Sequence, residues 1–199
     1  MKSNSTVPEL HQLRNHYLVM RHGHSQANAM GLVVSSPEHG LSGYGLSAKG
    51  EEQMSRRLAE WHLAAPQQIL YSDFLRTTET AQRVADHFDV PLNPDARLRE
   101  RFFGEYDLHP DHVYHDVWDM DARAPSQPLK QVESVHQVAE RLCALIAELE
   151  QRYNDTTLLL VSHGDPLQIL LTTAAGRPLN EHREISPLAP ADVRPLIAR

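Results

Sequence analysis

The chain has 199 residues, of which 41% are hydrophobic and 23% are charged, and it carries a formal net charge of −7. This length and composition are typical of one well-packed globular domain and exclude a fibrous or intrinsically disordered chain. The negative charge argues against a general nucleic-acid binder, because such proteins present a basic surface. An anionic substrate would therefore be bound by a local cluster of Arg and His side chains.

The cysteine count and the hydropathy pattern indicate the cellular compartment that we expect for this protein. Cys143 is the single cysteine, so an internal disulfide and a thiolate metal site are excluded. Residues 1–13 lack the apolar core of a signal peptide, and no apolar run reaches membrane-spanning length. We therefore expect a cytoplasmic protein, with the polar residues 1–15 forming a loosely held arm.

The first predicted strand, residues 17–20, is followed at once by a turn rich in hydrogen-bond donors. This turn reads Arg21-His22-Gly23-His24-Ser25-Gln26-Ala27-Asn28. Open α/β folds place their ligand sites at the carboxyl ends of strands, which favours a binding role for this turn. The alternative is that Arg21 and His22 merely end the strand while Gly23 reverses the chain.

The next segment joins this turn to the first predicted helix. Residues 29–46 are rich in glycine and proline, so we expect an irregular connection. Ser47 is a suitable N-cap for a helix that Pro66 closes. Four apolar residues recur at helical spacing within it, namely Met54, Leu58, Trp61 and Ala65.

Arg76 follows the second predicted strand, residues 68–71, and lies near the start of the next helix. Free N–H groups and partial positive charge at the amino end of a helix suit a phosphate group. A surface ion pair of Arg76 with Glu79 or Asp73 is the alternative. A brief third strand is expected over residues 90–92.

Residues 101–132 have no clear periodicity and are expected to form a cap-like excursion that covers a site. One short helix is predicted around residues 113–120. Five residues of this segment are of types that bind metals, namely His109, Asp111, His112, His115 and Asp116. A solvated, irregular cap is the preferred interpretation, because nothing fixes the tetrahedral ligand set that a metal such as zinc needs.

The C-terminal half alternates helix and strand. Ser134 and Gln137 form a capping-box pattern at the start of a strongly amphipathic helix. A fully apolar strand over residues 156–161 ends in Ser162-His163-Gly164-Asp165. Asp165 is expected to cap the following helix, with Pro166 in its first turn.

A last strand is predicted over residues 193–198, and Pro195 confines it to the edge of a sheet. The alternation of strands and helices predicts a three-layer α/β/α sandwich with a mostly parallel central sheet. We expect a single domain over residues 1–199, in which the cap is a short insertion.

Three of these predicted strands lead into His22, Arg76 and His163. Parallel strands bring their carboxyl ends to one edge of a sheet, so we expect these side chains to meet. Arginine offers a planar fork that matches phosphate oxygens, and a neutral imidazole can attack phosphorus. Glu100 is the candidate acid that protonates the leaving alkoxide. A surface glutamate paired with a neighbouring arginine, Arg99 or Arg101, is the alternative.

Arg21-His22-Gly23 with Ser25 and Asn28 resembles the signature of the histidine phosphatase superfamily, which includes cofactor-dependent phosphoglycerate mutases. The resemblance continues in the family's order over about residues 16–175. Its further blocks are Ser72-Asp73, Arg76-Thr77, Glu79-Thr80, Leu98, Glu100, Gly104, Glu133-Ser134-Val135 with Arg141, and Val161-Ser162-His163-Gly164.

The resemblance implies a role for each matching residue. His22 would be the nucleophile and Glu100 the proton donor. The phosphoryl group would be bound by Arg21, Ser25, Asn28, Arg76, His163 and the amide of Gly164. The family's phosphatase reaction uses no metal and no dissociable cofactor.

This chain departs from the mutases of the family at several positions. Mutases commonly carry Glu where His24 stands and Trp where Ala27 stands, and two adjacent arginines in the excursion hold the substrate carboxylate. Between Asp107 and Lys130 this chain has only Arg123. We therefore expect a phosphomonoesterase of the histidine acid phosphatase type, acting on small molecules, rather than a mutase.

Three alternatives stay open: a cofactor-dependent phosphoglycerate mutase, a metal-dependent hydrolase with His22 and His24 as ligands, and a phosphate-binding module without turnover. The metal-dependent reading is disfavoured because barrel hydrolases usually need about 250 residues. The expected partner is a small phosphorylated substrate, with neither nucleic acid nor membrane, and a homodimer stays open. The physiological substrate and the role of His24 do not follow from the sequence.

Overall fold

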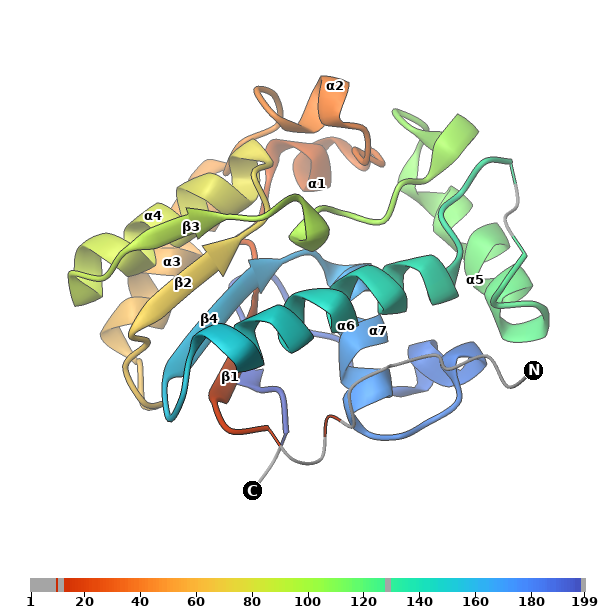
Figure 1. Ribbon diagram of the computed structural model, residues 1–199. Coiled ribbons are helices and arrows are strands. Elements are labelled where there is room, and N and C mark those ends of the chain that lie inside the picture. Colours follow the sequence, from red (N-terminus) through yellow and green to blue (C-terminus); the bar gives the residue numbers. More distant parts are fainter. Residues whose placement is uncertain (1–9, 11–12, 128–129, 198–199) are drawn as a thin grey trace, which may run out of the picture.

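The computed structural model describes residues 10, 13–127 and 130–197, which surround a central sheet of five strands in the order β3-β2-β4-β1-β5 (Figure 1). The strands are β1 (His16–Arg21), β2 (Gln68–Tyr71), β3 (Leu92–Pro94), β4 (Thr157–Ser162) and β5 (Val193–Pro195). β1, β2, β3 and β4 pair in parallel, whereas β5 pairs antiparallel with β1. The predicted, mostly parallel sheet is confirmed.

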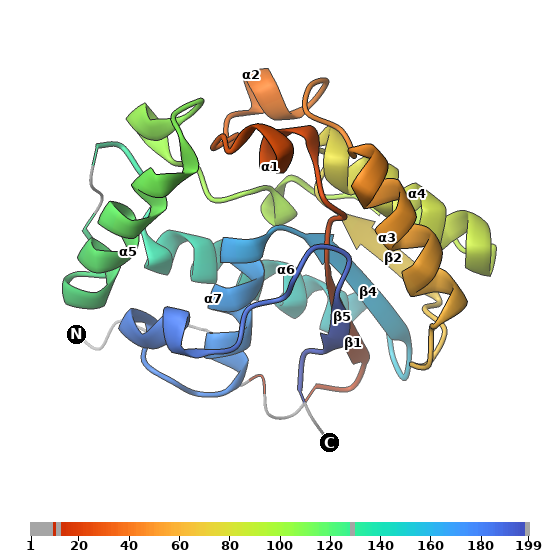
Figure 2. The same ribbon diagram turned by 180° about the vertical axis from the view of Figure 1, so that it is seen from behind.

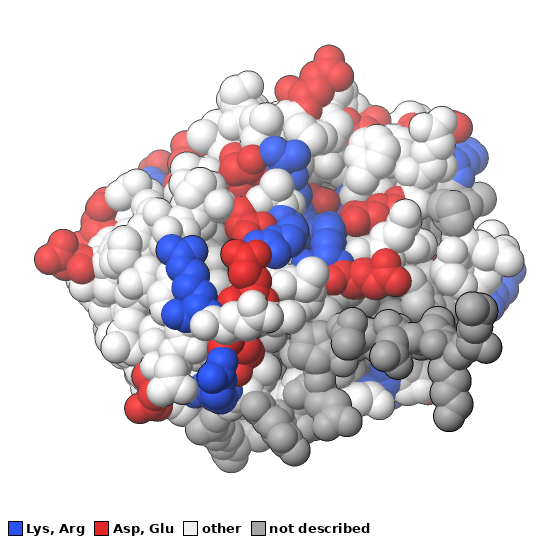
Figure 3. Space-filling model, viewed as in Figure 1, with Lys and Arg blue, Asp and Glu red and all other residues white. Residues whose placement is uncertain are grey.

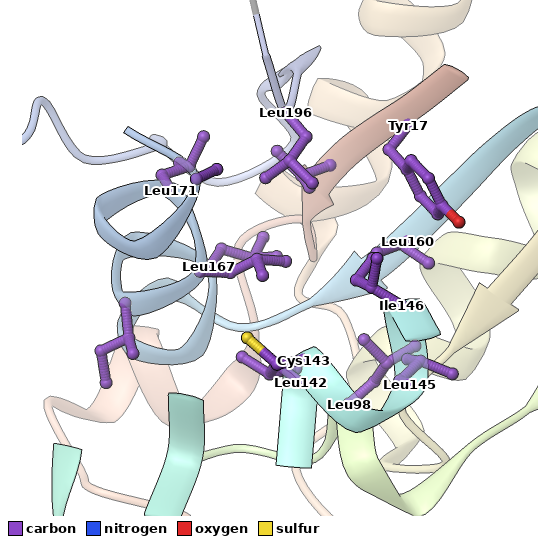
Figure 4. Packing of buried hydrophobic residues seen from close by; sticks show 14 of the residues in the cluster. Tyr17, Leu98, Leu142, Cys143, Leu145, Ile146, Leu160, Leu167, Leu171 and Leu196 are labelled. Atoms are coloured by element: carbon purple, nitrogen blue, oxygen red, sulfur yellow. The ribbon is translucent and has the colours of Figure 1, made fainter. Parts of the chain in front are cut away.

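Helices cover both faces of this sheet (Figures 1 and 2). The long helices are α3 (Ala48–Ala59), α4 (Leu75–Phe88), α6 (Val135–Arg152) and α7 (Gly164–Ala174). Alternate residues of a strand point to opposite faces, and in β4 Leu158 and Leu160 pack with α6 and α7 (Figure 4). Leu159 and Val161 pack on the other face with α3 and α4. The three-layer α/β/α sandwich is therefore confirmed.

The capping predictions for α3 and α6 are confirmed. The Oγ of Ser47 accepts from the backbone N–H of Gly50 at 3.2 Å. The Oγ of Ser134 accepts from the N–H of Gln137 at 3.2 Å, and the Gln137 side chain accepts from the Ser134 N–H at 2.8 Å. Each bond satisfies an amide that has no partner within its own helix.

The prediction that α3 extends to Pro66 is wrong, because the helix ends at Ala59. The chain turns after Glu60, and the indole N–H of Trp61 donates to the carbonyl of Leu63 at 3.0 Å. Trp61 still reaches the core, where its ring lies 5.2 Å from that of Phe88. Trp61 therefore looks, in the sequence, like the next apolar residue of the helix, although it packs in the core from a turn.

Two other strand boundaries shift slightly. The third strand is β3, which starts at Leu92 rather than Val90, because the N–H of Val90 still donates to the carbonyl of Ala85 at the end of α4. The last strand, β5, stops at Pro195 and lies at the edge of the sheet, as Pro195 predicts. The expected strand extended to Ala198, which lies outside the described residues.

The segment 29–46 is more regular than expected. It begins with the end of α1 (Gln26–Met30) and contains α2 (Pro37–Gly40). Ser36 caps α2 by accepting from the N–H of His39, and Pro37 occupies the first helical position, where its missing N–H costs no hydrogen bond. Both short helices lie beyond the carboxyl ends of the strands (Figures 1 and 2).

The predicted loose arm is wrong for the part of residues 1–15 that the structure describes. Leu10 is buried in the core cluster on the α6 side. The side-chain amide of Asn15 donates to Glu150 at 2.8 Å and to the carbonyl of Tyr153 at 3.0 Å, which joins this segment to the end of α6. Residues 1–9 and 11–12 lie outside the described residues.

The cap insertion contains the 3₁₀ turns η3 (Gly104–Tyr106) and η4 (Asp111–Val113) and the helix α5 (Tyr114–Arg123). α5 confirms the short helix expected around residues 113–120. Asp107 ties the cap to the connection before α3, because its carboxylate accepts from the Ser35 N–H at 2.6 Å and contacts the His39 ring at 2.7 Å. Among the described residues, no helix combines the length and apolarity that crossing a membrane requires.

Candidate active site

The register of the sheet brings the sequence-predicted site together. Arg21 pairs with Ser162 across β1 and β4, so His22 and His163 leave the sheet at the same level. A cavity of about 130 Å³ opens at this edge. Its lining includes Arg21, His22, Ser25, Asn28, Arg76, Glu100 and Gly164. His163 is fully buried just behind it, with its ring centroid 5.2 Å from that of His22.

His22 presents an unprotonated Nε2 atom. Its Nδ1 lies 2.7 Å from the carbonyl oxygen of Gly23, and because a carbonyl only accepts, Nδ1 carries the proton of the neutral ring. Arg76 donates its Nε–H to the Nε2 lone pair at 3.2 Å. Burial lowers the pKa of His22 well below its usual value, and the nearby Arg76 and Arg21 lower it further. The ring is therefore neutral, and the lone pair is on Nε2.

Arg76 is free of the acidic neighbours that the sequence offered as partners. Asp73 pairs instead with Arg99 at 2.6 Å, and Glu79 accepts from the backbone N–H of Leu46 at 2.6 Å. The Nη2 of Arg76 donates to the carbonyl of Val34 at 2.9 Å. Its Nη1 is buried and has no hydrogen-bond partner among the described residues.

Arg21 supplies a second guanidinium at the same edge. Its Nη1 donates to the carbonyl of Leu188 at 3.0 Å, whereas its buried Nε has no partner among the described residues. A Cβ added to Gly164, the first residue of α7, would lie 3.3 Å from the Arg21 Cζ atom. Glycine at this position therefore lets the Arg21 guanidinium pack closely against the start of the helix. Buried donors without partners are rare, and here they indicate an anionic ligand.

His163 presents its Nδ1 atom toward Glu100. Its Nε2 lies 2.8 Å from the Oγ of Ser72, which also accepts from the N–H of Phe74. The Ser72 hydroxyl hydrogen is then free to point at Nε2, which leaves the proton of the neutral ring on Nδ1. That buried Nδ1 has no hydrogen-bond partner among the described residues. It is a donor for an anion in the site.

Glu100 lies among these cationic groups. Its side chain is 9% exposed, and its Oε2 lies 3.8 Å from both Arg76 Nη2 and His163 Nδ1. Burial raises its pKa to about 7, although the charge of Arg76 opposes that rise. The alternative of a surface glutamate paired with Arg99 or Arg101 is wrong, because Arg99 pairs with Asp73 and Arg101 pairs with Asp121, each at 2.6 Å. A carboxyl group with this pKa can donate a proton near neutral pH.

Ser25 and Asn28 both line the cavity but are not equally available. The Ser25 hydroxyl donates to the Asn28 Oδ1 at 3.0 Å and accepts from the Asn28 backbone N–H at 3.2 Å, which forms the capping box of α1. Ser25 therefore acts through the position of α1. The exposed side chain of Asn28 still offers its amide N–H₂ to a ligand.

His24 and the histidines of the cap lie apart from this centre. The Nδ1 of His24 is hydrogen-bonded to the Ser47 Oγ at 2.8 Å, and His24 is not among the residues that line the cavity. The two imidazoles of His22 and His24 therefore have different partners. Within residues 10, 13–127 and 130–197, no group of three or more His, Cys, Asp or Glu side chains is arranged to hold a metal ion.

Several polar or aromatic cavity residues were missed from the sequence, among them Tyr114, Trp118, Gln168 and Arg183. Asp111, which the sequence offered only as a residue of metal-binding type, also lines the cavity. Asp165 was expected to cap α7, but His163 occupies the N-cap position. The Asp165 carboxylate instead accepts from the Arg101 guanidinium and the Trp118 indole, each at 3.1 Å. Helical spacing of Tyr114 and Trp118 was a usable signal, whereas nothing in the sequence pointed to Arg183.

The surface outside the cavity is mixed in charge. On the face seen in Figure 3, Lys and Arg side chains lie beside Asp and Glu, and the described residues form no extended basic surface there. Among the described residues, Arg21, Arg76 and Arg194 each have a buried guanidinium nitrogen without a hydrogen-bond partner, and the first two of these line the cavity. Attraction of an anion is therefore concentrated at the cavity.

Comparison with known proteins identifies similar sequences and folds. Residues 17–196 match the family model of the histidine phosphatase superfamily, branch 1. A probable phosphoglycerate mutase, GpmB, of Klebsiella pneumoniae is 31% identical over 174 residues, which cover 85% of this chain and 78% of that protein. The adenosylcobalamin/alpha-ribazole phosphatase of Escherichia coli is 28% identical over 169 residues, covering 80% and 79% of the two chains.

Solved structures show the same fold. A mycobacterial glucosyl-3-phosphoglycerate phosphatase superposes with a TM-score of 0.76 at 22% identity, covering 92% of this chain and 90% of that one. An Escherichia coli protein described as a putative alpha-ribazole-5'-P phosphatase superposes with a TM-score of 0.72 at 24% identity, covering 90% and 89%. At these identities the likeness supports the fold alone.

Proposed function

The chain belongs to the histidine phosphatase superfamily, branch 1, and we propose that it is a metal-independent phosphatase that hydrolyses small phosphate monoesters through a phosphohistidine at His22. The observation that carries this proposal is the state of His22. Its proton is held on Nδ1 by the Gly23 carbonyl, and its Nε2 lone pair accepts from the Nε–H of Arg76. A neutral, fixed imidazole beside an anion site is what attack on phosphorus requires.

In the first step the Nε2 of His22 attacks phosphorus, and the bond between phosphorus and the ester oxygen breaks. Arg21, Arg76 and the His163 Nδ1–H stabilise the negative charge on the phosphoryl oxygens. Glu100 transfers its proton to the leaving oxygen, so an alcohol departs. The positive charge that develops on the His22 ring is stabilised by the Gly23 carbonyl at Nδ1.

In the second step water replaces the alcohol. The Glu100 carboxylate takes a proton from the water as its oxygen attacks phosphorus, and the bond between phosphorus and the His22 Nε2 breaks. The products are inorganic phosphate, a neutral His22 and a protonated Glu100, so the enzyme returns to its starting state. The pKa of about 7 lets Glu100 act as acid and then as base near neutral pH.

Phosphoglycerate mutase is the second candidate, favoured by the similarity to the probable phosphoglycerate mutase of Klebsiella pneumoniae. The position of Arg123 supports the phosphatase instead. This arginine of the cap is exposed on α5 and does not line the cavity, so it offers the substrate no carboxylate contact. Incubation with phosphoglycerate and bisphosphoglycerate, followed by phosphorus NMR, distinguishes isomerisation from release of inorganic phosphate.

The test of the mechanism uses an aryl phosphate labelled with radioactive phosphorus, with and without a chelator. Turnover is expected to survive the chelator, and rapid denaturation in alkali is expected to leave acid-labile label on the protein. His22→Ala should abolish the label, whereas the control His24→Gln should retain it. Chelator-sensitive turnover, or labelling of the His22 variant, would contradict the proposal. Phosphate binding without hydrolysis of any ester would favour a binding module.

A further inference from the structure

A third arginine lines the cavity beside the phosphoryl site. Arg183 belongs to the 3₁₀ helix η5 (Leu179–Glu184), which follows α7, and its side chain is 31% exposed. Tyr114 and Trp118 of α5, Gln168 of α7 and two acidic residues, Asp111 and Asp165, also line the cavity. None of the catalytic steps described above uses this group.

The guanidinium of Arg183 packs against an aromatic ring. Its Cζ atom lies 3.6 Å from the centroid of the Trp118 ring. That indole is also stacked on Tyr114, with the centroids 5.2 Å apart and the planes at 7°. The Nη1 of Arg183 donates to Asp165 Oδ1 at 3.1 Å and also to Gln168 Oε1. The side chain is therefore ordered before any ligand arrives.

The other edge of the same guanidinium is open. Its Nε–H and Nη2–H groups have no hydrogen-bond partner among the described residues, and they are not among the buried unpaired atoms. These two donors form the side edge of arginine, which binds a carboxylate or phosphate through two parallel hydrogen bonds. An arginine that is already fixed loses little conformational entropy when it binds such a group.

A purely structural role explains only part of this arrangement. Asp165 needs a counter-ion, but Arg101 already lies 3.1 Å from its Oδ2. The contact through Arg183 Nη1 adds to that pairing, whereas the open edge contributes nothing to it. The cavity, the stacked indole and the unpaired edge together point to a ligand group opposite Arg183.

We propose that Arg183 determines substrate specificity by binding an anionic group on the alcohol part of the ester, either a carboxylate or a second phosphate. This inference rests on the proposed phosphatase function and extends it to a substrate class. The phosphoryl group lies against His22, Arg21 and Arg76, and the second anion lies against the free edge of Arg183. Esters of neutral alcohols lack this second contact and are poorer substrates.

The test compares three esters with one carbon skeleton: propanediol monophosphate, which is neutral beyond its phosphate, phospholactate, and propanediol bisphosphate. The measured quantity is the ratio of kcat/KM for each anionic ester to that for the neutral one. We expect a ratio above one for at least one anionic ester, and the preferred ester identifies a carboxylate or a phosphate as the natural group. Arg183→Gln should lower that ratio about 10-fold or more, because a charge-assisted hydrogen-bond pair is lost.

Two further variants distinguish the two parallel hydrogen bonds of the Arg183 guanidinium from an effect of its charge alone and from an effect on folding. Arg123→Gln removes the same charge from the exposed part of α5 and should leave the ratio within about 2-fold of the wild-type value. Arg183→Lys keeps the positive charge but cannot form the two parallel hydrogen bonds. On a logarithmic scale, its kcat/KM ratio should recover less than half of the decrease seen in Arg183→Gln. A general disturbance of the site lowers kcat/KM for all three esters and therefore cancels in the ratio.

Several outcomes would overturn the inference. These are a wild-type enzyme without preference for either anionic ester, an unchanged ratio in Arg183→Gln, an equal loss in Arg123→Gln, or full recovery in Arg183→Lys. Hydrolysis of an aryl phosphate runs beside each assay. If the aryl phosphate is hydrolysed and no preference is found, only this inference fails. If no ester is hydrolysed, the proposed function fails and this inference fails with it.

Discussion

The Nε–H of Arg76 lies 3.2 Å from the Nε2 of His22, so the arginine occupies the lone pair that the reaction uses. A phosphoryl group that enters the site must replace this contact, and the freed Nε–H then has a phosphate oxygen to bind. The same guanidinium holds a buried Nη1 that has no hydrogen-bond partner in the part of the chain that the structure describes. In the proposed mechanism one arginine thus keeps His22 neutral before the substrate binds and stabilises the transferring group afterwards.

Replacement of His22 by Ala should reduce aryl phosphate turnover by about 10³-fold or more, since removal of a nucleophile eliminates the covalent route. The measurement is steady-state hydrolysis together with thermal unfolding, and the variant should unfold within a few degrees of the wild type. Substantial turnover in a folded His22 variant would show that another group attacks phosphorus.

Glu100→Gln should slow hydrolysis of alkyl phosphates by about 10²-fold or more, and that of aryl phosphates with acidic leaving groups far less. A poor leaving group needs the proton that Glu100 donates, whereas a good one departs without it. Glu105→Gln is the matched control, because Glu105 is exposed in η3 beside the same segment. Equal slowing of both ester classes would remove Glu100 from the role of proton donor.

The pH dependence follows from the environments of Glu100 and His22. Burial raises the pKa of Glu100 to about 7, and the protonated form is the active acid. The kcat/KM for an alkyl phosphate should therefore fall as the pH rises through about 7. Burial lowers the pKa of His22, so its protonation should limit activity only well below its usual range. In Glu100→Gln the decrease of kcat/KM above about pH 7 should disappear. An unchanged decrease would show that another group is responsible for it.

The sequence was sufficient to predict the layers of the fold and the residues that meet at the strand ends. Both depend on local signals that the chain carries directly, namely apolar strands, the capping residues Ser47 and Ser134, and the turns after β1 and β4. The rule that parallel strands end at one edge then brings His22 and His163 together, with their ring centroids 5.2 Å apart.

The parts that were missed depend on contacts between distant segments. Asp165 looks like an N-cap because local patterns cannot show that Arg101 and Trp118 reach its carboxylate. Arg183 enters the cavity only because the chain after α7 folds back beside α5, and no local pattern contains that information. The end of α3 was misplaced for a similar reason, since Trp61 reaches the core from a turn.

The buried ion pair between Arg101 and Asp121 connects the cap to Glu100, the proposed proton donor. Asp121 accepts two hydrogen bonds from the Arg101 guanidinium, at 2.6 Å and 2.8 Å, and the Arg101 backbone N–H donates to Glu100 at 2.9 Å. Asp121→Asn should lower the free energy of unfolding by about 3 kcal/mol, because it leaves an under-compensated charge in the interior.

The matched control for that prediction is Asp119→Asn. Asp119 is exposed on the same helix, and its replacement should change the free energy of unfolding by no more than about 0.5 kcal/mol. Urea unfolding of both variants measures the difference. The Asp121 variant should also lose alkyl phosphate turnover at temperatures where it is fully folded, since the segment that holds Glu100 loses its anchor. Full activity in the folded variant would show that the position of Glu100 does not depend on the cap.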